Sequence, residues 1–252
     1  MKNELLWQPS KFVFRHGKLR ASKNRSEVGV GSRLIADYVA LAYDNNIPVY
    51  AKGKLLDLGC GKVPLYEKYR AYVSDITCVD WSFSPHQTSH LDLEWDLTTG
   101  LPFDDCSYDT IVLSDVLEHI PNPTHLLGEI SRVLRFNGVL IFNVPFLYNI
   151  HEHPYDFFRY TVFGLERIVS DAELEVEHLK VLGGAPEVIA VLLAKIVQKV
   201  PILGKTFAVA IQSCVAISVR RVRLFKRLSE RTGHLFPLGY FVVARKSPPQ
   251  KY

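Results

Sequence analysis

The sequence predicts an α/β fold built on a mainly parallel sheet. Short apolar runs alternate with helical stretches between residues 32 and 145, and one of these runs leads directly into an acid and two glycines. Strands that alternate with helices indicate βαβ units and a parallel sheet. The chain has 252 residues, 48% of them hydrophobic, so it can bury one large core. We therefore expect one domain at 32–252, preceded by an N-terminal arm or flap at 1–31.

The N-terminal segment combines aromatic and basic side chains without clear periodicity or a strong turn signal. A mobile flap and a docked arm both fit this composition. Helical spacing of apolar residues begins after it, with Ser32 as a candidate N-cap and Asn45 and Asn46 as a candidate stop. The pattern predicts an amphipathic helix that packs on the elements that follow.

The later elements are expected in chain order. Strands are predicted at 54–59, 76–81, 108–115 and 138–145, with a helix at 124–135 before the last of them. Beyond these the pattern predicts a helix around 163–171, a strand near 174–181 and a final strand at 239–246.

A helical insertion is expected before the last strand, from residue 185 to about residue 232. Pro201 and Gly204 divide the apolar and basic part, 185–228, into two predicted helices. The apolar stretch of the second helix has about 13 residues, too few to span a bilayer. A basic cluster follows it: Arg220, Arg221, Arg223, Lys226 and Arg227. Contact with an anionic membrane surface, a cover over the substrate pocket and a homodimer face all fit this stretch.

Composition argues against several classes of function. The net charge is +4 and the basic residues form no single stripe, so no nucleic-acid partner is expected. The four cysteines lack zinc-like spacing, which predicts reduced thiols and no metal site. We find neither a secretory signal nor a spanning segment, which predicts a cytoplasmic location, including the inner face of the membrane.

The strongest motif is the run Leu55-Leu56-Asp57-Leu58-Gly59-Cys60-Gly61. Gly59 and Gly61 permit a tight turn and let a ligand approach bare backbone amides. About 20 residues later the second strand ends at Asp80, whose carboxylate can accept hydrogen bonds from both hydroxyls of a ribose. Strand, acid, glycines and second acid in this order predict a nucleoside pocket.

The motif set resembles the class I S-adenosylmethionine (SAM) dependent methyltransferases, in particular the methyltransferase type 11-like, small-molecule branch. The resemblance covers residues 32–145 firmly and the final strand loosely. It is carried by D-L-G-C-G at 57–61, Asp80, D-L-T-T-G-L-P-F at 96–103 and D-V-L-E-H at 115–119. It implies SAM as the cofactor and a Rossmann-like, doubly wound, mostly parallel seven-stranded sheet whose last strand is antiparallel.

The same resemblance implies roles for individual residues. The loop from Gly59 to Gly61 would lie beside the methionine part of SAM, Asp80 would hold the ribose, and Asp96 would face the adenine amine. Residues 115–119 would lie along the pocket floor, although a helical His119 facing the core is more often packed than catalytic. The expected cofactor-binding residues are Asp57, Gly59, Cys60, Gly61, Asp80, Trp81, Asp96, Leu97, Ser114 and His119.

One departure concerns the loop, because Val63-Pro64 stands where a third glycine often follows. A nicotinamide-dependent dehydrogenase shares the fold and the acidic ribose contact, but its fingerprint needs a glycine where Pro64 stands. Phosphate-loop ATPases are excluded, since no G-x-x-x-x-G-K-[ST] occurs. A SAM-binding scaffold without turnover is the remaining alternative.

The candidate catalytic residues follow the strand at 138–145, in the run F-L-Y-N-I-H-E-H-P-Y-D-F-F-R-Y-T. His151 or His153 could be the general base, with Glu152 or Asp156 orienting it, and Arg159 could hold an anionic or sugar substrate.

The alternative for this run is a structural loop in which Arg159 pairs with Asp156. A metal site at His151-x-His153 lacks a third ligand, so none is predicted. Similar segments in methyltransferases of cell-surface glycan and lipid-linked pathways favour an O-methyltransferase acting on a small-molecule, glycan or lipid-linked acceptor.

Overall fold

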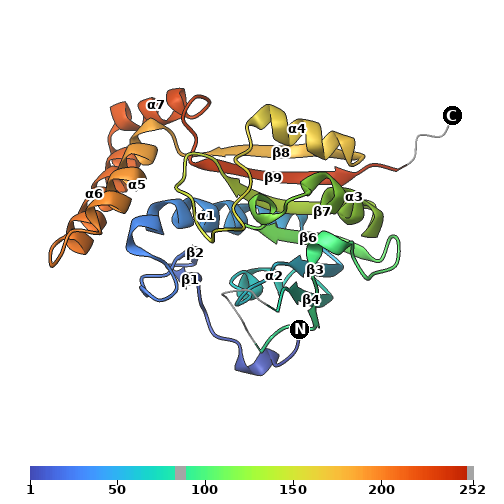
Figure 1. Cartoon of the computed structure of the whole chain (residues 1–252). Coiled ribbons are helices and arrows are strands. Elements are labelled where there is room, and N and C mark those ends of the chain that lie inside the picture. Colours follow the sequence, from blue (N-terminus) through green and yellow to red (C-terminus); the bar gives the residue numbers. More distant parts are fainter. Residues whose placement is uncertain (83–88, 249–252) are drawn as a thin grey trace.

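The computed structural model describes residues 1–82 and 89–248. Its centre is a seven-stranded sheet with strand order β5-β4-β3-β6-β7-β9-β8 (Figure 1). Neighbouring strands from β5 to β7 are parallel, and β9 is antiparallel to both β7 and β8. The fold class predicted from the sequence is confirmed, including the antiparallel last strand. The strands are β3 (Lys54–Leu58), β4 (Asp75–Asp80), β5 (Leu93–Glu94), β6 (Tyr108–Ser114), β7 (Leu134–Pro145), β8 (Leu174–Leu182) and β9 (Gly239–Lys246).

Helices cover both faces of this sheet (Figure 1). On one face, Tyr43 and Ile47 are fully buried beside Phe241 of β9. On the other, Leu126 and Leu165 belong to a second apolar cluster. The helices of these two layers are α1 (Arg33–Tyr50), α2 (Tyr66–Tyr69), α3 (Pro123–Val133) and α4 (Val162–Asp171), and the short 3-10 turns are η1 (Glu4–Leu6), η2 (Val30–Ser32), η3 (Leu97–Thr99) and η4 (Leu117–His119).

The N-terminal boundary expected for α1 is confirmed, because Ser32 is the N-cap residue, but the expected C-terminal boundary is wrong. Ser32 makes no capping bond, because its hydroxyl lies 2.7 Å from the Tyr148 hydroxyl instead. Asn45 and Asn46 do not stop the helix, which continues to Tyr50. Asn46 is buried and donates to the carbonyl of Ala42 one turn earlier, so its amide is satisfied inside the helix.

The N-terminal arm is docked, and it contains a hairpin that the sequence pattern did not reveal. β1 (Phe12–Arg15) pairs antiparallel with β2 (Lys18–Ala21) across a turn in which His16 and Gly17 both have positive φ. The hairpin packs on α1, where the Asp37 carboxylate pairs with Arg20 and accepts from the Ala21 amide at 2.8 Å.

Three helices, rather than the two expected, lie between β8 and β9: α5 (Ala185–Val197), α6 (Gly204–Arg221) and α7 (Arg223–Thr232). They gather at one edge of the molecule, near the start of α1 (Figure 1). Between α6 and α7 the chain leaves helical geometry at a single residue, Val222. The basic cluster is therefore divided between these two helices. Within the described residues, no helix is long and apolar enough to cross a membrane.

The fully buried Glu187 fastens this group of helices to the domain. Its carboxylate accepts from the Tyr38 hydroxyl at 2.6 Å, from the Ser229 hydroxyl at 2.7 Å and from the Gly184 amide at 3.0 Å. α1, α5 and α7 therefore meet at one carboxylate, and a shared hydrogen-bond network of this kind fixes their positions.

Candidate functional site

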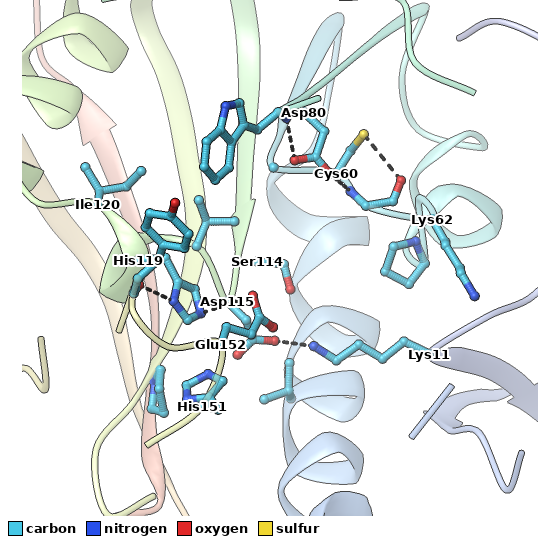
Figure 2. Close-up of a pocket in the computed structure, with 18 of the residues that line it drawn as sticks. Lys11, Cys60, Lys62, Asp80, Ser114, Asp115, His119, Ile120, His151 and Glu152 are labelled. Carbon is cyan, nitrogen blue, oxygen red and sulfur yellow. Dashed lines mark hydrogen bonds and ion pairs between the residues drawn. The ribbon is translucent and has the colours of Figure 1, made fainter. Parts of the chain in front are cut away.

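A cavity of about 870 Å³ opens beyond the carboxyl ends of β3, β4 and β6 (Figure 2). In open α/β sheets this is the edge at which ligands bind. The structure brings most of the predicted site residues to this cavity. Those that line it are Asp57, Gly59, Cys60, Gly61, Asp80, Trp81, Asp96, Leu97, Ser114, His119, His151, Glu152 and His153.

The glycine loop after β3 forms one end of the cavity. Gly59 has a φ of 65°, and a Cβ there would lie 2.5 Å from Cγ2 of Val116, so no other residue fits without displacement. Gly61 donates its amide to Oδ2 of Asp80 at 2.8 Å, and the Trp81 amide donates to Oδ1 at 2.7 Å. Two backbone donors thus fix the Asp80 carboxylate beside bare backbone.

The loop keeps a left-handed conformation where the third glycine is missing. Val63 is fully buried and has a φ of 50°, which is strained for a β-branched residue. Its amide donates to the carbonyl of Cys60 at 2.8 Å, which closes the turn. The departure from the family pattern therefore changes the residue type but retains the geometry that a glycine would adopt.

Two buried groups lie behind this loop. Burial raises the pKa of Asp57 to about 7, although the hydrogen bond from the Tyr69 hydroxyl opposes the shift. A hydrogen bond with Cys78, together with burial, raises the pKa of the Cys60 thiol well above its usual range. Cys60 is therefore a protonated thiol at neutral pH and not a nucleophile.

The outer side of the cavity is partly aromatic. The Trp81 ring meets Tyr155 edge to face, with the ring centroids 5.2 Å apart. Asp96 caps η3, where one carboxylate oxygen accepts from the amide of Thr98 at 2.9 Å and from its hydroxyl at 2.8 Å. This leaves the second Asp96 oxygen as the one open to a ligand.

The other end of the cavity holds the two histidines His119 and His151, whose ring centroids lie 4.8 Å apart. His119 is not a core-facing helical residue, because it ends the short turn η4 and its ring reaches the cavity. Burial and the neighbouring His119 lower the pKa of His151, so it is neutral at physiological pH.

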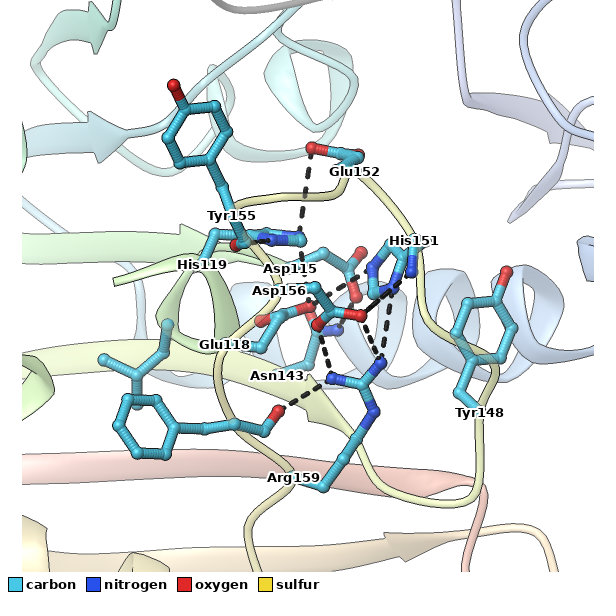
Figure 3. A network of polar contacts seen from close by, with 12 residues as sticks. Asp115, Glu118, His119, Asn143, Tyr148, His151, Glu152, Tyr155, Asp156 and Arg159 are labelled. Atoms are coloured by element: carbon cyan, nitrogen blue, oxygen red, sulfur yellow. Dashed lines mark hydrogen bonds and ion pairs between the residues drawn. The ribbon is translucent and has the colours of Figure 1, made fainter. Parts of the chain in front are cut away.

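Asp156 and Arg159 lie behind His151 and do not line the cavity (Figure 3). Arg159 donates to both Asp156 oxygens, at 2.6 and 2.7 Å, and the His151 amide donates to Oδ2 at 2.9 Å. Burial opposes ionisation of Asp156, but these hydrogen bonds hold its pKa at about 2. The ion pair considered as the structural alternative is therefore present, and it fixes the backbone that carries His151.

Sequence reasoning missed two charged residues of the site. Lys11, on the arm, places its Nζ 2.5 Å from Oδ2 of Asp115 (Figure 2). Glu118 lies fully buried behind the histidines. No local pattern marks Lys11, because its contact spans 104 positions. Glu118 was expected only as part of the pocket floor at 115–119, with no chemical role of its own.

Comparison with known proteins finds a family that matches part of the chain around this cavity. The methyltransferase domain family matches residues 56–142. A ubiquinone biosynthesis O-methyltransferase of Photobacterium profundum is 27% identical over 103 residues, covering 36% of this chain and 43% of that protein. The chain thus matches less than half the length of this relative.

Solved structures support the fold. An S-adenosylmethionine dependent methyltransferase from Mesorhizobium loti superposes with a TM-score of 0.52 at 14% identity, covering 82% of this chain and 99% of that one. The cyclase SpnF gives a TM-score of 0.54 at 18% identity, covering 94% and 88%. Because a cyclase shares the fold, the reaction has to be argued from the site itself.

Proposed function

We propose, from the premise that residues 56–142 form the core of a class I SAM-dependent methyltransferase, that this chain transfers the methyl group of SAM to an acceptor hydroxyl. The observation that carries the proposal is the composition of the cavity. One end offers a fixed carboxylate and bare backbone for a nucleoside, and the other offers histidines for proton transfer, among them the neutral His151. A binding scaffold would need only the first.

The cofactor end fits SAM in shape and in chemistry. A cavity of about 870 Å³ is within the range that encloses cofactors. Gly59 lets the loop turn with bare backbone against Val116, and Asp80 can accept the ribose hydroxyls while its backbone donors hold it in place. Trp81 and Leu97 would flank the adenine ring, and the open oxygen of Asp96 would accept from its amine.

Methyl transfer requires two contributions from the protein: alignment of the acceptor and removal of its proton. When bound, SAM supplies the electrophilic methyl group on its sulfonium. The chain holds the acceptor oxygen in line with that methyl, which is an entropic contribution. Of the two predicted bases, we favour His151, because its ring lies against the Asp156 carboxylate, with Nδ1 3.3 Å from Oδ2.

Turnover separates this proposal from its alternatives. Full-length protein is incubated with SAM and a panel of small hydroxylated acceptors, and both S-adenosylhomocysteine and methylated product are quantified. We expect the two products in equal amounts and no binding of nicotinamide dinucleotides. Tight SAM binding with no product from any acceptor would support the scaffold function instead.

We further propose that the acceptor is lipid-linked and is reached at an anionic membrane surface. The outward sides of α5, α6 and α7, here called the helical surface, are unusually apolar. Of the 26 exposed large hydrophobic residues in the described part of the chain, 15 lie between residues 185 and 236, so the exposed apolar area is concentrated there. On α5 they form one stripe of Ile189, Leu192, Leu193 and Ile196, where a helix facing water would be polar.

The positive charge of the helical surface indicates which kind of partner covers it. Residues 185–236 hold nine Lys and Arg against two Glu, whereas the rest of the chain holds 21 against 24. Two copies meeting through this surface would place like charges together, which opposes a homodimer. Anionic lipid headgroups complement the charge, and the apolar side chains can enter the acyl boundary.

The helical surface also adjoins the cavity. Lys195 of α5 donates to the Tyr148 hydroxyl at 2.7 Å, and Tyr148 lines the cavity. A lipid-linked acceptor lying along the surface would therefore meet the acceptor end of the cavity first.

Vesicle sedimentation across a salt series tests the membrane proposal. We expect pelleting with anionic vesicles, little with neutral ones, and release as salt screens the attraction. Each basic residue near the surface contributes about 1 kcal/mol. The double variant Arg221→Glu, Arg223→Glu should lose binding, whereas Lys52→Glu, Lys54→Glu, an equal charge change elsewhere, should retain it. Equal loss in both variants, or no lipid-dependent pelleting, would overturn the proposal.

A further inference from the structure

The Glu118 side chain, which lies behind the histidines of the cavity, is the most unusual polar group of the site. It is fully buried, and neither carboxylate oxygen has a hydrogen-bond partner among the described residues. The other carboxylates of the site, Asp57, Asp80 and Asp156, each accept at least one hydrogen bond. Burial and the nearby Asp115 raise the pKa of Glu118 well above its usual value, because the positive charges of Lys11 and Arg159 offset these effects only in part.

Two imidazoles direct nitrogen atoms toward this carboxylate (Figure 3). Nε2 of His119 lies 3.9 Å from Oε1 of Glu118, and Nε2 of His151 lies 4.0 Å from the same oxygen. These distances are too long for hydrogen bonds. All three atoms lie within 4.8 Å of one another, which leaves a gap between three potential ligands.

The opposite nitrogen of each ring is already positioned. Nδ1 of His119 lies 2.7 Å from the carbonyl oxygen of Tyr155, so it carries the hydrogen and Nε2 keeps its lone pair. Nδ1 of His151 lies 3.3 Å from Oδ2 of Asp156. Arg159 also approaches this Nδ1, at 3.4 Å, but both hydrogens of that Nη2 already serve Asp156 at 2.7 Å and the Asn149 carbonyl at 3.2 Å. Asp156 and Arg159 thus both face Nδ1 of His151, and Nε2 is the nitrogen turned toward Glu118.

We propose that Glu118, His119 and His151 bind a divalent transition-metal ion. Two imidazole nitrogens and one carboxylate oxygen form a recurrent ligand set for such ions, and a carbonyl or carboxylate behind each histidine is the usual support. The three atoms form a triangle with two sides of 3.9 and 4.0 Å and a third of up to 4.8 Å, whose centre lies about 2.3–2.5 Å from its corners, somewhat longer than metal–ligand bonds of about 2.0–2.2 Å. Small rotations of the side chains would complete the site.

The sequence could not indicate this site. The interpretation based on His151-x-His153 lacked a third ligand, and the fold supplies His119 and Glu118 from η4 instead, leaving His153 outside. Because His119 and His151 line the cavity, the free coordination positions would face the acceptor.

The site also suggests how the proton is removed, a role that rests on the proposed methyl transfer. An acceptor hydroxyl bound to the ion would release its proton to solvent more easily. Its oxygen would then attack the methyl carbon, and the carbon–sulfur bond would break with its electron pair remaining on sulfur. With the ion bound, His151 would act as its ligand, and the ion would take over the activation of the hydroxyl that His151 provides as a base in the metal-free protein.

Metal binding is measured on full-length protein freed of metal by a chelator, then titrated with Zn²⁺ or Co²⁺ by calorimetry and checked by elemental analysis. We expect one ion per chain and far weaker binding of Mg²⁺, which prefers oxygen ligands. Glu118→Gln, His119→Ala and His151→Ala should each weaken Zn²⁺ binding at least tenfold, on the order expected when a ligand or its support is lost. His153→Ala is the matched control, because it removes a histidine from the same loop but outside the cluster.

Several results would overturn the site. They are the absence of stoichiometric binding, an equal effect of His153→Ala, or a thiolate absorption band with Co²⁺, which would assign the ion to a cysteine such as the exposed Cys214. Thermal unfolding of each variant with and without Zn²⁺ separates lost ligation from lost folding. SAM affinity is measured in parallel, so that failure of the metal site and failure of the proposed methyl transfer are distinguishable.

Discussion

The two ends of the cavity are built in different ways. At the cofactor end, contiguous backbone after β3 and the last residue of β4 make the contacts, and Asp80 is fixed by two amides. At the acceptor end, the polar groups are side chains from three separate segments: Lys11 from the arm, His119 from η4 and His151 from the loop after β7. The first end is set by local geometry, whereas the second depends on how distant segments meet.

This difference separates the two tasks. A backbone pocket tolerates few substitutions, because Gly59 cannot carry a Cβ. Side chains on loops can change without changing the sheet, which is how one fold serves many acceptors. Substitutions at the two ends should therefore affect different measurements, and the following predictions test that separation.

The largest effect is expected at the acceptor end. His151→Ala should reduce turnover by about a thousandfold, the scale expected when proton removal is lost, and leave the SAM dissociation constant within about twofold. His153→Ala should reduce turnover far less, because His153 lines the cavity but does not belong to the cluster of Glu118, His119 and His151. Steady-state turnover and calorimetric SAM binding on both variants provide the test. Equal losses from the two variants would show that the loop, and not the imidazole of His151, matters.

At the cofactor end the pattern should be reversed. Asp80→Asn keeps the shape of the side chain but removes its charge, so SAM and S-adenosylhomocysteine should bind about a hundredfold more weakly, as expected for lost charge-assisted bonds. Turnover at saturating SAM should fall far less. Asp104→Asn, an exposed acid outside the cavity, is the control. Calorimetry that gave equal affinities for wild type and Asp80→Asn would remove Asp80 from the site.

The same contrast explains what the sequence could predict. All the residues predicted for the cofactor end line the cavity, because strand, acid and glycines are adjacent in the chain and the sheet fixes the spacing to Asp80; that they bind SAM stays a prediction. The acceptor end was predicted only in part. His151 was identified from its loop. The roles of Glu118 and Lys11 depend on contacts with residues 33 and 104 positions away in the sequence, and no periodicity reveals such contacts.

The fold followed the same rule. Buried strands with continuous apolar runs were found close to their observed positions, while the hairpin at 12–21 and the end of α1 were not. The hairpin was missed because its turn residues, His16 and Gly17, are a weaker signal than Asn-Gly. The end of α1 was missed because the buried Asn46 bonds within the helix rather than capping it.

The smallest effect is expected at Val63, where the cofactor loop keeps a glycine-like φ of 50° without a glycine. Replacing a buried valine by glycine normally costs more than replacing it by alanine, because a further methyl group and backbone order are lost, together about 1–2 kcal/mol. At a left-handed position alanine retains a strain of about 1–2 kcal/mol that glycine relieves. The free energies of unfolding of Val63→Gly and Val63→Ala should therefore be nearly equal.

Val112, fully buried in β6, is the matched control, and there the glycine variant should be clearly less stable than the alanine variant. Urea unfolding of the four variants gives both differences. A difference in unfolding free energy between the glycine and alanine variants that is as large at Val63 as at Val112 would show that Val63 is unstrained. The geometry of the cofactor loop would then not depend on a glycine-like turn at this position.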